Sequence, residues 1–198
     1  VQQWSSGGLG KASSVSLRGL EARHTLLLID GVRYSSATVG LPTWENIPLE
    51  SIERIEIVRG PLSGLYGSDA VGGVIQIFTR RGKDGLRANA VATVGSKRFG
   101  QLGGGVNFGQ GAFDGSLQVQ RTENSGFSAT NSNVPFGSYN SDNDGFRQNS
   151  GNAQLGWKIG GSWRADARLL QSDGVTQYDD GRSADAKAKL RTQVASVN

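Results

Sequence analysis

The sequence predicts a mainly β protein, in which a small mixed α/β domain is followed by antiparallel strands of a transmembrane β-barrel, present as a partial barrel. Two observations predict this fold. Glycine supplies 30 of the 198 residues, while apolar residues supply 36% and charged residues 19%. That composition is typical of short extended segments and turns, not of a helical bundle or a charged disordered chain. Polar and apolar residues also alternate strictly over the second half of the chain, as in strands that separate two environments.

Residues 1–82 are predicted to form the mixed α/β domain. The apolar run Leu26–Ile29 ends at Asp30-Gly31, a pair favoured in type I′ hairpin turns because both central residues need a positive φ. Pro48 suits the first position of a short helix that would run through Leu49 and Ile52. Two further strands are expected at residues 54–59 and 74–79.

Residues 83–198 are predicted to form about six antiparallel strands. The alternation covers residues 86–94, 99–108, 113–120, 153–159, 163–169 and 184–190. Tight turns alternate along the chain with long connections, which are predicted at residues 123–145 and 172–183. Short turns at one rim and long loops at the other are typical of outer-membrane barrels, although the strands of a soluble antiparallel sandwich alternate as well.

The composition argues against several functional classes. A chain without cysteine has no disulfide scaffold, thiolate metal site or cysteine nucleophile. His24 is the only histidine, so a histidine-rich catalytic or zinc site is not expected, and neither is an enzyme. The net charge of +4 comes from scattered residues. Because a nucleic-acid backbone is tracked by clustered basic residues, we expect no nucleic-acid partner.

Three motifs resemble the plug domain of TonB-dependent outer-membrane receptors. The longest of them runs from Ile52 to Pro61 (IERIEIVRGP) and continues from Ser63 to Ile77 (SGLYGSDAVGGVIQI). Ser16–Gly19 and Leu28–Arg33 resemble two further plug motifs, in the expected order. Motifs in register over so much of the first domain are far more specific than the alternation of the strands.

The resemblance implies a plugged barrel of about 22 strands in the outer membrane of a Gram-negative bacterium. Such receptors import scarce nutrients with energy delivered by TonB together with ExbB and ExbD, and they require no cofactor. Tyr66–Ala70 and Asp142–Phe146 are most similar to the members that transport cobalamin. Cobalamin is therefore the expected ligand, and outer-membrane lipid surrounds the barrel. The alternatives are a ferric-siderophore or heme receptor of the same family, and a soluble β-rich binding or adhesion module.

The resemblance also implies roles for plug residues. The loop Tyr34–Leu41 would face the substrate, and its small polar side chains suit hydrogen bonding to a large polar ligand. The binding residues implied are Tyr34, Ser35, Ser36, Thr38, Val39 and Gly40. In such receptors, plug arginines pair with barrel carboxylates. Arg59 matches this latch best, and Arg18 and Arg33 are its expected companions.

Four aspartates lie in or just after the second predicted loop: Asp173, Asp179, Asp180 and Asp185. Oxygen-rich loops suit calcium, which takes about six to eight oxygen ligands. Tyr178-Asp179 also resembles a calcium-binding position of the cobalamin-transporting members. A solvated acidic loop accounts for the same residues, so calcium is a candidate ion and not a required one.

About six strands cannot close a barrel of this family. An open half-barrel would leave unpaired strand edges in lipid, which is physically untenable. We therefore expect the chain to be part of a longer receptor, in which the start of the plug and the segment that contacts TonB precede residue 1. A calcium cage would then draw further ligands from later loops.

Overall fold

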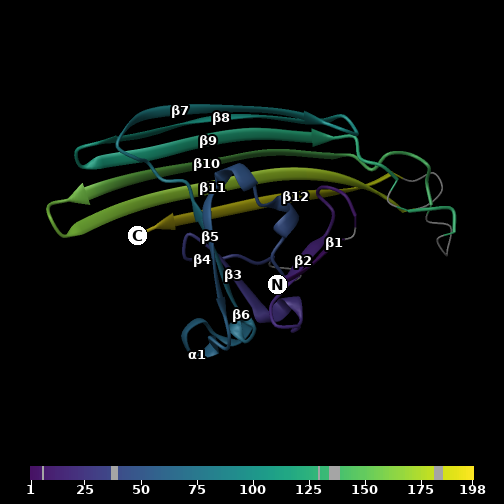
Figure 1. The fold of residues 1–198 in the computed structure, drawn as a ribbon, viewed down its shortest axis with the longest axis horizontal. Coiled ribbons are helices and arrows are strands. Elements are labelled where there is room, and N and C mark those ends of the chain that lie inside the picture. Colours follow the sequence, from purple (N-terminus) through teal and green to yellow (C-terminus); the bar gives the residue numbers. More distant parts are fainter. Residues whose placement is uncertain (6, 37–39, 129, 134–138, 181–184) are drawn as a thin grey trace.

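The computed structural model describes residues 1–5, 7–36, 40–128, 130–133, 139–180 and 185–198. An antiparallel sheet of six strands, here called the barrel wall, lies across one side of a smaller body (Figure 1). The smaller body contains a four-stranded and a two-stranded sheet and is here called the plug. Among the described residues, no helix is long and apolar enough to span a membrane.

The strands of the barrel wall follow one another in chain order, and each pairs antiparallel with the next. They are β7 (Gly85–Gly95), β8 (Phe99–Gln110), β9 (Phe113–Asn124), β10 (Phe146–Ile159), β11 (Trp163–Asp179) and β12 (Asp185–Val197). The predicted antiparallel strands are confirmed. The predicted second loop, residues 172–183, is wrong over most of its length, because β11 stays paired with β12 as far as Asp179.

The two rims of the wall differ in their connections (Figure 1). Residues 111–112 and 160–162 form short links at one rim, here called the turn rim. Residues 96–98, 125–145 and 180–184 connect the strands at the opposite rim, here called the loop rim. The long connection predicted between residues 123 and 145 is confirmed to within a residue or two of its ends.

One face of the wall is turned toward the plug and the other away from it. On β10 and β11 the even-numbered residues face the plug, as contacts of Gln148, Leu170 and Ser172 show. The odd-numbered residues face away, and among them Leu155 and Trp163 are 61% and 77% exposed. The apolar sides predicted for these two strands are therefore the outward sides, as a lipid-facing surface requires.

Strand β12 has the same inward-facing even-numbered residues but a different distribution of apolar side chains. Thr192 and Val194 contact the plug, so the even-numbered residues of β12 face inward. The apolar residues of the predicted strand 184–190 are the even-numbered ones, so they are turned inward where they are described, and Lys187 and Lys189 lie outward. The strand register decides this orientation, because a shift by one residue would exchange the two faces.

The plug is built on a four-stranded sheet with the order β4-β3-β6-β5. Its strands are β3 (Thr25–Ile29), β4 (Val32–Arg33), β5 (Ile52–Arg59) and β6 (Gly73–Thr79), and β1 (Gln2–Ser5) pairs with β2 (Ser13–Ser16) beside it. The β3–β4 hairpin turns at Asp30 and Gly31, whose φ angles are 49° and 85°, as the type I′ prediction requires. The short helices are α1 (Ser63–Tyr66), η1 (Ala22–His24), η2 (Trp44–Asn46), η3 (Leu49–Ser51) and η4 (Ser68–Ala70). The predicted helix at Pro48 is the 3-10 turn η3.

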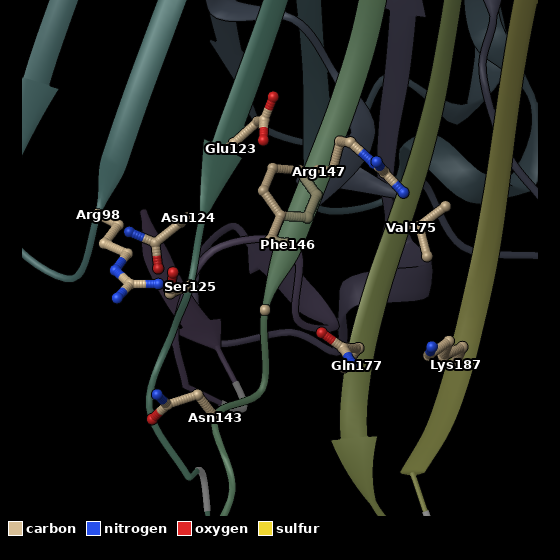
Figure 2. Close-up of a pocket in the computed structure, with 11 residues that line it drawn as sticks. Arg98, Glu123, Asn124, Ser125, Asn143, Phe146, Arg147, Val175, Gln177 and Lys187 are labelled. Atoms are coloured by element: carbon tan, nitrogen blue, oxygen red, sulfur yellow. The ribbon is translucent and has the colours of Figure 1, made fainter.

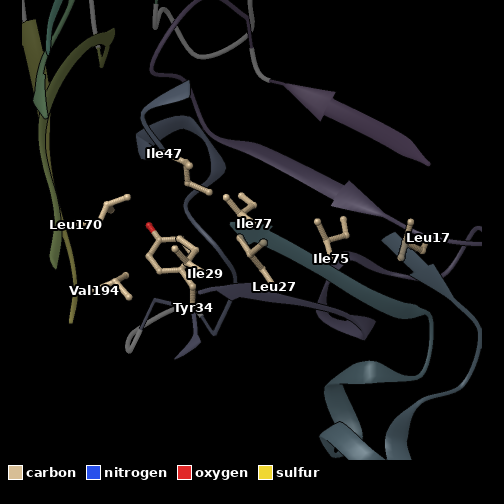
Figure 3. Packing of buried hydrophobic residues seen from close by; sticks show 9 residues of the cluster. All are labelled: Leu17, Leu27, Ile29, Tyr34, Ile47, Ile75, Ile77, Leu170 and Val194. Carbon is tan, nitrogen blue, oxygen red and sulfur yellow. The ribbon is translucent and has the colours of Figure 1, made fainter. Parts of the chain in front are cut away.

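The plug core continues into the wall. Every residue of β3 is buried, and this strand runs parallel to β6 at the centre of the sheet. Figure 3 shows the resulting apolar cluster, which consists of Leu17, Leu27, Ile29, Tyr34, Ile47, Ile75, Ile77, Leu170 and Val194. Since Leu170 and Val194 belong to β11 and β12, burial of apolar surface holds the plug against the wall.

The segment that joins the two parts, residues 80–84, is itself fixed to the inner face of the wall. The Gly82 amide donates to Gln154 Oε1 at 3.0 Å, and Ser116 Oγ donates to the Arg80 carbonyl at 2.8 Å. A Cβ at residue 82 would lie 2.3 Å from the backbone nitrogen of Gly115. Only glycine therefore fits at this position without movement of the backbone.

Candidate functional site

The first polar contact between plug and wall is made by Asn46, at the end of η2. Its side chain is 1% exposed. Its Nδ2 donates to the Ser172 carbonyl at 3.1 Å and to Thr192 Oγ1 at 2.8 Å. Its Oδ1 accepts from Gln148 Nε2 at 3.1 Å and from Ser172 Oγ at 3.3 Å. Both donors and both acceptor sites of the amide are thus satisfied by β10, β11 and β12. This cluster is here called the Asn46 contact.

Tyr34 extends the Asn46 contact. Its hydroxyl lies 2.8 Å from Thr192 Oγ1 and also bonds Thr43 Oγ1. The residue is 8% exposed, and its ring points toward Leu170 and Val194 of the wall (Figure 3). Tyr34 was predicted from the resemblance to bind substrate. In the described structure its side chain is committed to the plug–wall interface, at the base of the loop that follows it.

The second polar contact is an ion pair between Asp30 and Arg168. Asp30 Oδ1 lies 2.8 Å from Arg168 Nη1, and the two side chains are 5% and 8% exposed. The Thr79 amide and hydroxyl also donate to the Asp30 carboxylate, at 3.1 and 2.5 Å. Asp30 reaches the wall because it occupies the tip of the β3–β4 turn. Here the plug supplies the carboxylate and the wall supplies the arginine, the reverse of the polarity predicted for the latch.

The three arginines predicted for the latch lie elsewhere. Arg33 pairs within the plug: its Nη1 is 2.7 Å from Asp69 Oδ2, and its Nη2 donates to the Tyr66 carbonyl at 2.9 Å. Arg18 and Arg59 are exposed. Within the described ranges, none of the three forms an ion pair with a carboxylate of the wall. A latch between these arginines and other parts of a complete barrel stays a prediction.

A third contact lies near the loop rim, where Lys11 enters from the plug. Its Nζ donates to the Gln177 carbonyl and is 3.8 Å from Asp144 Oδ1, with side chains 8% and 2% exposed. Burial lowers the pKa of the Lys11 ammonium, and the negative charges of Asp144 and Asp179 oppose that shift. The ammonium therefore lies near Asp144 of the 125–145 connection and near Asp179 at the end of β11.

The predicted substrate loop is described at its two ends. Ser35 and Gly40 are exposed. The Ser36 amide donates to the Leu41 carbonyl at 2.9 Å, and the Gly40 amide donates to the Ser36 carbonyl at 2.8 Å. Thr38 and Val39 lie outside the described residues. The loop is thus closed at its base by backbone hydrogen bonds and by the anchored Tyr34.

The four predicted calcium ligands do not converge. Asp173 and Asp179 are separated by six residues of β11, about 20 Å along a strand, and Asp173 pairs with Arg191 at 2.6 Å. Asp180 is exposed, and the side chain of Asp185 lies outside the described part. Among the described residues, no three acidic or histidine side chains are grouped closely enough to hold a metal ion. Asp179 fits a calcium site best, because its Oδ1 is buried without a hydrogen-bond partner in the described ranges.

Sequence reasoning missed Asn46, the Asp30–Arg168 pair and Lys11. Asp30 is predicted only as a turn residue, and its position in the turn is confirmed. Its ion pair with Arg168 has no signature in the neighbouring sequence. Arg168 lies on the polar side of the predicted strand 163–169. In a barrel that side faces the interior, so a pairing of this arginine with a plug carboxylate could have been considered. Asn46 is the last residue of the short η2 turn and has no sequence signature of its own.

Comparison with known proteins places this geometry in a family. Residues 1–74 match the family model described as the TonB-dependent receptor plug domain. The vitamin B12 transporter BtuB of Photobacterium profundum is 41% identical over 180 residues, which are 90% of this chain and 29% of that protein. BtuB of Vibrio cholerae is 34% identical over 184 residues, 91% of this chain and 29% of that protein. The chain therefore spans under a third of the length of these curated relatives.

Solved structures have the same fold. The ferric yersiniabactin uptake receptor FyuA of Yersinia pestis aligns with a TM-score of 0.72 at 22% identity, over 96% of this chain and 33% of that one. The siderophore receptor PirA of Acinetobacter baumannii aligns with a TM-score of 0.68 at 20% identity, over 89% and 28%. These similarities show a plug with adjoining strands of a partial barrel. The plug match and the BtuB relatives show that the chain belongs to the TonB-dependent receptor family.

Proposed function

We propose that the receptor containing this chain imports cobalamin across the outer membrane of a Gram-negative bacterium, driven by TonB with ExbB and ExbD. The observation that carries the proposal is the similarity, over 90% of this chain, to a protein named as a vitamin B12 transporter. The siderophore receptors among the solved structures are 22% identical or less. Similarity at that level concerns the fold alone, so a ferric siderophore is the second candidate ligand.

The geometry of the plug supports a coupling between ligand and wall. The loop that begins at Ser35 follows directly on Tyr34, whose hydroxyl bonds Thr192 of β12. A ligand bound to this loop would act on Tyr34, which shares its hydrogen-bond partner Thr192 with the Asn46 contact. Binding at one end of the plug can therefore bias the interface that must open during transport.

Import also requires the plug to move relative to the wall. The contacts described above suit such a movement because they are polar. When the plug shifts, water replaces the lost hydrogen bonds of Asn46 and the charge–charge contact of Arg168, so the net cost of separation is much smaller than the gross interaction. The apolar contacts of Leu170 and Val194 have no such replacement and favour the return of the plug.

Equilibrium binding of cobalamin to the full-length receptor tests this proposal. We expect saturable binding, and we expect Ser35→Ala to raise the Kd about fivefold if one hydrogen bond to the ligand is lost. Ser63→Ala, on exposed α1, is the matched control and should bind as the parent does. Binding of a ferric siderophore and not of cobalamin would reject cobalamin and favour the second candidate ligand.

Calcium is tested in the same assay. Asp179 is the proposed ligand because its free carboxylate oxygen is buried. If calcium takes part, chelation weakens cobalamin binding by the parent receptor and leaves Asp179→Ala at the already weakened value. Binding that is indifferent to chelation in both proteins would remove calcium from the proposal and leave cobalamin in place.

A further inference from the structure

Basic side chains gather on the outward face of the barrel wall, near the loop rim. They are Arg121 of β9, Arg147 of β10, and Lys187, Lys189 and Arg191 of β12. The strand register brings them together: Val175 of β11 pairs with Arg147 on one side and with Lys189 on the other. Figure 2 shows Arg147, Val175 and Lys187 on adjacent strands. These five residues are here called the outer basic patch.

The outer basic patch has more positive charge than its neighbours neutralise. Arg121 pairs with Glu123 at 2.5 Å, and Arg191 pairs with Asp173 at 2.6 Å. Among the described carboxylates, none forms an ion pair with Arg147, Lys187 or Lys189. Five cations against these two carboxylates leave three positive charges on an exposed surface, where they attract anions.

Two clefts open within the patch. One of about 560 Å³ is lined by Arg98, Arg147 and Lys187 together with Glu123 (Figure 2). The other, of about 600 Å³, is lined by Arg121, Arg147, Lys189 and Arg191 together with Asp173. Arg147 belongs to both. A phosphate in either cleft would contact cations from at least two strands.

The patch begins where the apolar outer surface ends. Toward the turn rim the outward face presents Leu117, Leu155, Leu169 and Val197, which are 42–83% exposed. At the turn rim Phe113 and Trp157 stack with ring centroids 5.8 Å apart, as in an interfacial aromatic girdle. From Asn149 to Ile159, β10 covers about 34 Å along its length. At a tilt of about 40–45° that projects to about 25 Å, the height of the apolar band of such barrels.

We propose that the outer basic patch binds the phosphates of anionic lipid headgroups in the membrane leaflet at the loop rim. The inference rests on the proposed function, because it places the wall in the outer membrane. The patch faces away from the plug, so it does not lie on an import route through the barrel. Its continuity with the apolar band places it at headgroup depth, where a lipid can bury its chains against the leucines while its phosphate meets the cations.

The test uses the full-length receptor in nanodiscs of phosphatidylcholine doped with about one tenth cardiolipin, whose headgroup has two phosphates. Lipid retained through extraction is counted by native mass spectrometry. We expect cardiolipin to be enriched on the parent receptor. In Lys187→Gln/Lys189→Gln the relative affinity should fall on the order of 25-fold, about fivefold for each cation removed at a membrane surface. The control, Arg87→Gln/Lys158→Gln, removes two exposed cations from the inward face near the turn rim and should retain the enrichment.

Equal retention of cardiolipin by the parent and the Lys187/Lys189 variant would overturn the inference. So would displacement of cardiolipin by inorganic pyrophosphate at equal concentration, because the site would then bind free phosphate and not lipid. Gel mobility with and without boiling checks that each variant forms a closed barrel. Cobalamin binding is measured in the same nanodiscs: its absence alongside cardiolipin enrichment would reject the proposed ligand and leave the patch standing.

Discussion

Two of the buried polar contacts between the plug and the wall have opposite electrical character. The Asp30–Arg168 contact is ionic, and the Asn46 contact is neutral, with every polar atom of the amide paired. Both are anchored on β11, at Arg168 and Ser172, about 13 Å apart along the strand. The same interface thus contains two kinds of attachment that respond differently to loss of a partner.

The two contacts differ in what the loss of one partner costs. Removal of one member of a buried ion pair leaves an uncompensated charge and costs about 3–5 kcal/mol, whereas the intact pair contributes little over an apolar replacement. Loss of a neutral buried partner costs about 1–3 kcal/mol. The ionic contact is therefore the sensitive one, and the neutral contact fixes the position of the plug on β10, β11 and β12.

The largest effect is expected for Arg168→Met. It strands the Asp30 carboxylate at the interface, and we expect the free energy of plug release to fall by about 3–5 kcal/mol. Release in urea can be followed in the full-length receptor with a fluorophore at Leu65→Cys, since Leu65 is 81% exposed and residues 1–198 contain no cysteine that would compete for the label. Arg23→Met, which breaks an exposed pair with Glu21, should release at the parental urea concentration.

A smaller effect is expected at the neutral contact. Asn46→Ala leaves Gln148 and the Ser172 carbonyl without a partner, so release should become easier by about 1–3 kcal/mol. The same urea titration measures it. Asn89→Ala, at an exposed position of β7, is the control. A loss as large as that of Arg168→Met would remove the distinction between the two contacts.

The linking segment, residues 80–84, is held against the wall by close packing, in contrast to the ionic and the neutral contact. Gly82→Ala places a Cβ 2.3 Å from the Gly115 nitrogen and 2.6 Å from the Phe108 carbonyl oxygen. Because these neighbours are backbone atoms, the segment must shift, and we expect a loss of about 1–3 kcal/mol. Gly161→Ala has open space around it and should change nothing. Equal stability of the two variants would show that the link is not fixed to the wall.

Lys11, near the loop rim, should make the free energy of plug release depend on pH. Its pKa is lowered by burial in the folded receptor, so the folded state binds fewer protons than the unfolded state. The cost of the buried ammonium is fully present below the folded pKa and disappears as the pH rises toward 10.5. Plug release should therefore become harder with rising pH, by at most about 1.4 kcal/mol per pH unit. Lys11→Met should flatten this dependence, and an unchanged slope would contradict it.

The strands and the hairpin of the plug could be predicted because their signals are local. Alternation is visible wherever one face is apolar, as in Ala153–Ile159, and Asp30-Gly31 tolerates the positive φ angles that a type I′ turn requires. The sequence wrongly predicts a loop over residues 172–179 of β11, because Gln171–Gly174 is polar and ends in glycine. Its extended backbone is imposed by pairing with β12, and no local pattern records that pairing.

The plug–wall contacts could be predicted only in kind. The resemblance predicted ion pairs between plug arginines and wall carboxylates, whereas the described Asp30–Arg168 pair has the reverse polarity. Its polarity and partners depend on where a turn meets a strand more than 130 residues later in the chain. The Asn46 contact depends on the meeting of three strands with one loop, which no single segment reveals.

A double-mutant cycle tests most directly the claim that the Asp30–Arg168 contact and the Asn46 contact hold the plug independently of each other. Asp30→Asn, Arg168→Met and their combination are compared in the release assay, with Asn46→Ala/Arg168→Met as the reference pair. We predict a coupling of about 2–3 kcal/mol between Asp30 and Arg168, and additivity within about 0.5 kcal/mol between Asn46 and Arg168. Additive effects of Asp30→Asn and Arg168→Met would contradict the ionic contact, and strong coupling of Asn46 to Arg168 would contradict the independence of the two.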